Sequence, residues 1–151
     1  MKEFGRQLAW SFMVFLWVCT TGCEPTQGSM DSTEAAQAPT FAEISGLLVK
    51  RGCAEGTCHG GVSPQAGLNL EPEFAYEALV NQPCSMPGAA ELGLNLVTPG
   101  DPDNSFLYVK VMLSDDDPHL GSPMPTYGSG LSLEDTEKIR LWIEAGAPRN
   151  P

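Results

Sequence analysis

The chain has 151 residues, of which 8 are Lys or Arg and 19 are Asp or Glu, so its formal net charge is −11. This acidic excess disfavours nucleic acid as a partner and adhesion to anionic membranes through basic side chains, because both need clusters of Lys and Arg. The length suits one small domain behind a targeting segment and excludes two independent cores.

The first segment has the pattern of an export signal. Two basic residues precede an apolar run over residues 8–18, which is too short to cross a bilayer comfortably. The run ends in CTTGC at 19–23, which resembles the lipobox of bacterial lipoproteins. We therefore predict a signal peptide over residues 1–22 and a lipid anchor at Cys23. Because Thr20 replaces the usual Leu, cleavage by the ordinary signal peptidase is the alternative. After either cleavage at this point, 6 basic and 18 acidic residues remain, a net charge of −12.

A polar tether and then a first helix are expected next. Residues 23–39 are small, polar and bounded by proline, as in a flexible linker between a lipid and a folded domain. Thr40 and Glu43 have the spacing of a capping box, and a helix of about twelve residues follows up to Arg51. Its apolar residues recur at helical intervals: Phe41, Ile44, Leu47 and Leu48.

The middle of the chain predicts two further helices separated by a loop. Residues 72–81 start with a proline, which favours a helix N-terminus, and their expected apolar contacts are Phe74, Tyr76, Leu79 and Val80. Residues 82–95 are rich in Gly and Pro and are expected to form a loop. Residues 103–113 favour a helix, although Tyr108, Val109 and Val111 also fit a short strand.

The last helix is the clearest pattern in the chain. Ser132 and Asp135 resemble a capping box, and Gly146 followed by Pro148 ends the helix. Its apolar stripe consists of Leu133, Ile139, Trp142 and Ile143. Phe41 and Trp142, on the first and last helices, are expected to pack in the core and are compatible with a cofactor-pocket wall.

The sequence CAEGTCHG, residues 53–60, places Cys53 and Cys58 next to His59. In covalent haem attachment, two thiols bond the porphyrin edge while the next residue's imidazole reaches the iron, so cysteine and histidine must be adjacent. The usual spacing has two residues between the cysteines. Here there are four, and the extra residues must bulge from the loop, with Gly56 permitting the bend.

Other interpretations of the same residues remain open. Cys53 and Cys58 can form a small-loop disulfide in an oxidising compartment. A zinc site would need Cys84 and His119 as further ligands, and a catalytic thiol would need an orienting group that is not evident. Cys84 is left without a partner, either as a buried free cysteine or in a disulfide with Cys53 that would leave haem on Cys58 alone.

The opposite iron ligand has several candidates in the sequence. Met124 is favoured because it lies in the Gly/Pro-rich segment 121–125, which can present a thioether rigidly. His119 is the alternative, and an open position is another. Met86 is a further candidate, whereas Met112 lies within an apolar segment and is expected in the core.

Residues 40–147 resemble the class I cytochrome c family, in particular the single-haem modules of exported bacterial lipoproteins of the planctomycete and myxobacterial kind. The resemblance rests on the order of five segments: CHG at 58–60, GLNL at 67–70, VTPGDP at 97–102, MP at 124–125 and IRLWIEAGA at 139–147. It implies an all-α, cytochrome c-like small helical domain around one haem c, followed by a tail at 148–151. It also implies that the first and last helices cross and pack near the haem.

The resemblance assigns Cys53 and Cys58 as thioether sites, His59 as proximal iron ligand and Met124 as distal ligand. The expected function is single-electron transfer in the envelope of a Gram-negative-type bacterium, periplasmic-facing or at the surface, without enzymatic activity of its own. The acidic surface suits a redox partner protein with a basic docking patch, and Cys23 would supply the membrane attachment. The alternatives are a haem-free, disulfide-stabilised accessory or binding lipoprotein, and a peroxidase-like haem protein with an open distal site.

Overall fold

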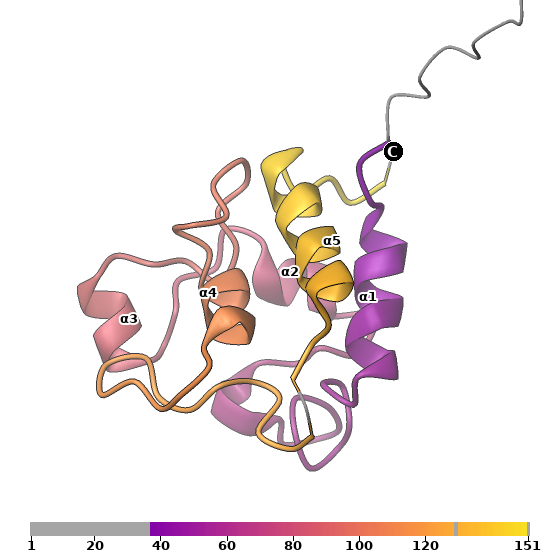
Figure 1. Cartoon of the computed structure of the whole chain (residues 1–151). Coiled ribbons are helices and arrows are strands. Elements are labelled where there is room, and N and C mark those ends of the chain that lie inside the picture. The colour runs from indigo at the N-terminus through magenta and orange to yellow at the C-terminus, as the bar shows by residue number, and fades with distance from the viewer. Residues whose placement is uncertain (1–36, 129, 151) are drawn as a thin grey trace, which may run out of the picture. The chain divides into compact units, whose positions relative to one another are not determined.

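Short helices joined by long turns make up the regular structure of this computed structural model, which describes residues 37–128 and 130–150 (Figure 1). The helices are α1 (Phe41–Lys50), η1 (Gln65–Gly67), α2 (Ala75–Leu79), α3 (Pro87–Glu91), α4 (Phe106–Met112) and α5 (Leu133–Glu144). Within these described ranges, β-pairing is limited to isolated bridges, and no helix is long and apolar enough to cross a membrane. The predicted signal peptide, the lipid anchor Cys23 and most of the predicted tether lie outside the described residues.

The first and last helices form where the sequence predicts them. At the start of α1, the Glu43 amide donates to the Thr40 hydroxyl, and the Thr40 amide donates to the Glu43 carboxylate at 2.7 Å, so the capping box is complete. At the start of α5, the Ser132 hydroxyl accepts from the Asp135 amide at 3.1 Å. The two helices pack against each other, as Figure 1 shows.

An aromatic cluster fills the space between α1, α2 and α5. The Phe41 ring lies with its centroid 5.0 Å from that of Tyr76, edge to face, and 5.6 Å from that of Trp142. Trp142 is fully buried, and its indole N–H donates to the Pro148 carbonyl. The expected core role of Phe41 and Trp142 is therefore confirmed, and neither residue lines the large cavity beside the cysteine loop.

The middle of the chain differs from the sequence prediction in its helix boundaries. The predicted helix 72–81 is reduced to α2, because the chain first turns at Glu71, whose carbonyl accepts from the amides of Phe74 and Ala75. Phe74 is half exposed and is not a core residue. The predicted loop 82–95 contains α3, where proline at the first position fixes a helical φ and two alanines follow. The helix predicted over 103–113 is confirmed as α4, in a shorter form.

Besides Phe74, two further apolar residues predicted to be buried lie at the surface. Leu133 is 85% exposed and Met112 is 49% exposed. Each is a terminal residue of its helix, Leu133 the first of α5 and Met112 the last of α4, where the chain leaves the packed face. The spacing of apolar residues indicates which face of a helix is buried, but it does not show at which residue the helix ends. Both expectations were therefore wrong.

Isolated bridges hold the loops that complete the fold. Val80 pairs with Val97, and Asn95 pairs with Ser105 just before α4. A further bridge joins Asp117 to Gly121 in the long connection after α4. The first two bridges place the segments after α2 and before α4 beside one another, and the third closes a turn within the segment after α4. Parts of all these segments line one cavity.

Candidate functional site

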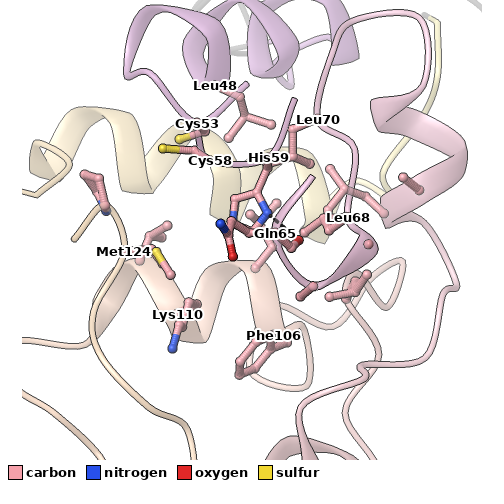
Figure 2. Close-up of a pocket in the computed structure, with 18 of the residues that line it drawn as sticks. Leu48, Cys53, Cys58, His59, Gln65, Leu68, Leu70, Phe106, Lys110 and Met124 are labelled. Carbon is pink, nitrogen blue, oxygen red and sulfur yellow. Dashed lines mark hydrogen bonds between the residues drawn. The ribbon is translucent and has the colours of Figure 1, made fainter. Parts of the chain in front are cut away.

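A cavity of about 990 Å³ brings together the residues that the sequence singles out, with the cysteine loop on one side and the segment around Met124 on another (Figure 2). This volume is at the upper end of the range typical of small-molecule and cofactor pockets. Most of the lining side chains that separate these two segments are apolar, among them Leu48, Leu68, Leu70, Leu79, Leu96, Phe106 and Val111. The cavity therefore suits a large, mostly apolar ligand with a few polar contacts.

The loop from Cys53 to His59 is closed by backbone hydrogen bonds. The Cys58 amide donates to the Glu55 carbonyl at 2.8 Å, and the His59 amide donates to the Cys53 carbonyl at 3.0 Å. Between the cysteines, residues 55–57 are exposed to solvent. The bulge predicted for the longer spacing is thus confirmed. Two of its residues, Glu55 and Thr57, lie at the edge of the cavity, and both cysteines are on the cavity wall.

Gly60, directly after His59, is buried against this loop. A Cβ atom at Gly60 would overlap the carbonyl oxygen of Ala54. A larger residue would therefore push apart the two ends of the cysteine loop. Packing within the cysteine loop therefore explains the glycine at position 60 without reference to any ligand.

The imidazole of His59 is oriented by one hydrogen bond. Its Nδ1 lies 3.1 Å from the carbonyl oxygen of Gln65, and Figure 2 shows this contact beside the cavity. A carbonyl accepts only, so Nδ1 is the donor, and in the neutral imidazole the lone pair is then on Nε2. A backbone carbonyl on one ring nitrogen is the usual way of fixing a histidine that binds a metal through the other.

The two thiols of the loop lie on the same part of the cavity wall (Figure 2). Burial raises the pKa of the Cys53 thiol, and the neighbouring Cys58 raises it further. Cys53 therefore stays protonated at neutral pH. Cys53, Cys58 and Cys84, the cysteines of the described residues, are all free.

Met124 and His119 differ clearly in their placement. Met124 is partly buried and lines the cavity, and its amide donates to the Lys110 carbonyl of α4 at 3.3 Å. His119 is exposed and is not part of the lining. Its backbone lies so close to Gly88 of α3 that a Cβ atom there would overlap the His119 carbonyl. Of these two candidates for the opposite ligand, only Met124 lines the cavity.

The other sulfur-bearing candidates have different positions. Met86 lines the cavity together with Met124, whereas Met112 does not. Cys84 is buried in a second apolar cluster with Ala89, Leu94 and Phe106, and it also lines the cavity. This placement agrees with the prediction of a buried free cysteine.

Two contributors to the cavity wall were missed by the sequence reasoning. Gln65 acts through its backbone carbonyl, which no residue pattern signals. Lys110 interrupts an apolar run and is 8% exposed, so a buried cation within an amphipathic helix was the available signal. Burial lowers the pKa of Lys110, while Cys84, Asp116 and Asp117 act in the opposite direction.

A charged contact joins the end of α1 to the start of α5 near the cavity. The Arg51 guanidinium, which also lines the cavity, pairs with the Asp135 carboxylate. Burial alone would raise the pKa of Asp135, but its hydrogen bonds with Ser132 and Arg51 outweigh that effect and lower it. Among the residues described, no group of three or more His, Cys, Asp or Glu side chains is placed to hold a metal ion.

Comparison with known proteins gives no relative for this chain: no family model, no curated protein and no solved structure matches it.

Proposed function

We propose that this protein binds one haem c covalently and carries single electrons in the bacterial cell envelope. The observation that carries the proposal is the orientation of His59: its Nδ1 is engaged by the Gln65 carbonyl, and Nε2 is left for a metal at a cavity that Met124 also lines. Imidazole and thioether are one axial ligand pair of low-spin electron-transfer haems. Both cysteines that precede the histidine lie on the same cavity wall.

The residues present fit such a group in kind and in place. Cys53 and Cys58 would form the thioether bonds, His59 would be the proximal ligand and Met124 the distal ligand. When bound, haem supplies one-electron chemistry at its iron, and a Met/His ligand pair gives a higher potential than histidine alone. The protein contributes fixed ligands and an apolar wall that excludes water, which also favours the less charged, reduced state.

The charge of the protein suits a specific class of partner. With a net charge of −11, the surface would attract a redox protein that carries a basic docking patch, through long-range steering that salt weakens. The membrane attachment through Cys23 stays part of the proposal, because that residue lies outside the described ranges.

Covalent haem can be tested on the full chain produced together with a c-type haem maturation system. The wild-type protein is expected to stay coloured after denaturation and to gain the mass of one haem. His59→Ala is expected to change the iron coordination seen in the absorption spectrum. The matched control is His119→Ala, which removes the other histidine of the chain, exposed and outside the cavity, and is expected to leave the spectrum unchanged.

A folded but colourless wild-type protein would refute the proposal. It would favour the haem-free alternative, in which Cys53 and Cys58 form a disulfide. The proximity of the two thiols on one wall is the observation in favour of that alternative. Intact mass before and after reduction distinguishes the two, because a disulfide adds two hydrogens on reduction and a haem does not leave.

A peroxidase-like protein with an open distal site is the other alternative, and Met124 decides it. Ferric haem with methionine as axial ligand has a characteristic weak absorption in the near infrared. We expect this absorption in the wild type and its loss in Met124→Ala. Its absence from the wild type would leave covalent haem in place but would make Met124 a wall residue only.

A further inference from the structure

Lys110 is an unusual residue on the wall of the cavity. It is 8% exposed, and its ammonium lies 5.6 Å from the centroid of the Phe106 ring. Placing a charged group in such surroundings costs free energy unless hydrogen bonds compensate. A methionine of similar shape would fill the same space without that cost. The position of the charge therefore calls for a reason other than packing.

Lys110 bonds the segment 120–124 at both of its ends. Its ammonium donates to the Leu120 carbonyl, and its own backbone carbonyl accepts from the Met124 amide at 3.3 Å. The side chain and the main chain of one residue in α4 thus fix the two ends of the segment that carries the Met124 thioether.

Gly121, which lies between these two contacts, is at a position that only a residue without a side chain fits well. Gly121 has φ +71°, and a Cβ atom there would lie 2.9 Å from Met86 Cε and 3.3 Å from Lys110 Nζ. A glycine at this position lets the segment lie directly on the lysine and on Met86. Just before the segment, the Asp117 carboxylate accepts from the amides of His119 and Leu120, each at 2.8 Å. The turn before Met124 is closed, and its inner face lies on Lys110.

We propose that Lys110 is the positioning residue for Met124: its ammonium holds the turn at Leu120 against α4, so that the Met124 thioether stays at the cavity instead of moving away with the loop. The inference rests on the proposed function, in which Met124 is the distal ligand of the haem iron. The backbone bond to Met124 is available to any residue at position 110, so the specific contribution of lysine is the side-chain bond to Leu120.

The test uses the full-length holoprotein and competition at the iron. Imidazole added to the ferric protein displaces a weakly held thioether more easily than a firmly held one, so its apparent affinity reports how well Met124 is positioned. In Lys110→Met we expect imidazole to bind about tenfold more tightly, equivalent to the loss of about 1.4 kcal/mol, together with a weaker near-infrared absorption. Met124→Ala sets the upper limit of the effect.

The other variants separate positioning from general stability. Lys110→Arg keeps a charged donor and should retain most of the wild-type absorption and imidazole affinity. Lys138→Met removes a lysine that is bonded to Glu134 on the exposed face of α5, and it should behave as wild type. If Lys110→Met does not fold, the comparison of Lys110→Gln with Lys110→Arg replaces it, with weaker thioether binding expected in the glutamine variant.

The outcomes are distinct for the two proposals. A wild type without covalent haem refutes the proposed function. A wild type with Met-ligated haem whose Lys110→Met variant keeps the near-infrared absorption and the imidazole affinity refutes the positioning role, even if that variant melts at a lower temperature.

Discussion

The helix pair α1–α5 and the segment that carries Met124 are built in different ways. α1 and α5 start at side-chain caps, pack face to face and share a buried aromatic cluster. Residues 113–127 contain no helix; they are held by the Asp117–Gly121 bridge and by contacts with α3 and α4. His59 lies in the hydrogen-bonded loop that begins after the end of α1, whereas Met124 belongs to the second region. The two proposed iron ligands therefore come from parts of the protein that are held by different numbers of contacts.

This difference indicates where the site can change. A segment held by a few bonds opens locally at a lower free energy than a packed helix pair, because local stability follows buried apolar contact. His59 should keep its orientation under conditions in which Met124 is already displaced. The distal side is thus the side on which ligand exchange, potential and partner contact would be adjusted.

The largest effect is expected from truncating the aromatic core of the helix pair. Trp142 is fully buried and packs on Phe41, so Trp142→Ala should lower the free energy of unfolding by about 3–5 kcal/mol through lost burial and the remaining cavity. Chemical denaturation followed by circular dichroism measures this. A loss below about 1 kcal/mol would mean that the helix pair is not the more stable region, and the comparison would fail.

A substitution at Gly88 should affect mainly the second region. A Cβ atom at Gly88 would overlap the His119 carbonyl, so alanine must push the 113–127 segment away from α3. We expect Gly88→Ala to cost about 1–3 kcal/mol, as for other overpacked sites. Limited proteolysis should show faster cleavage within 113–127, whereas the helical circular dichroism stays unchanged. Equal protease resistance in variant and wild type would contradict this.

The sequence was informative where structure is determined locally. The ends of α1 and α5 were predicted because caps and apolar periodicity lie within a few residues of one another, and Thr40 and Ser132 both act as caps in the structure. The exposed bulge between Cys53 and Cys58 also followed from spacing alone. These features need no knowledge of distant parts of the chain.

The rest depended on contacts between distant segments or on the backbone. α3 was missed because its short Pro-Gly-Ala-Ala-Glu sequence resembles a loop, and the Gln65 carbonyl was missed because backbone acceptors leave no trace in residue identity. Lys110 meets Leu120 only through the turn after α4. The preference for Met124 over His119 rested on local rigidity. The structure supports this choice for a different reason, namely that His119 lies outside the cavity lining.

The link between the ends of α1 and α5 gives a smaller, pH-dependent effect. Asp135 is largely buried and pairs with Arg51, so Asp135→Asn should cost about 1 kcal/mol at neutral pH. Because the pKa of Asp135 is lowered in the folded protein, its carboxylate stabilises the fold above the unfolded pKa of about 3.9, and this contribution is lost as the pH falls through the folded value.

Thermal unfolding of both proteins across the acid range checks the sign of this effect. The difference between wild type and Asp135→Asn should be constant above about pH 5 and should shrink as the pH falls below about 4. Other carboxylates with lowered pKa values, such as Glu43 and Asp117, are present in both proteins and cancel from the difference. A difference that grows in acid would show that Asp135 is destabilising when charged.

The smallest expected effect has the opposite sign and concerns the glycine in the middle of α1. Gly46 is exposed and has a helical backbone, and a Cβ atom added to it would meet no neighbouring atom within 4 Å. Gly46→Ala should therefore raise the free energy of unfolding by about 0.5–1 kcal/mol, because alanine loses less backbone entropy in a helix. It is also the matched control for Gly88→Ala, since the same substitution meets open space in one region and a carbonyl in the other. If Gly46→Ala instead destabilises the protein, another group must contact the exposed face of α1. The stability of the helix pair would then depend on contacts outside the pair.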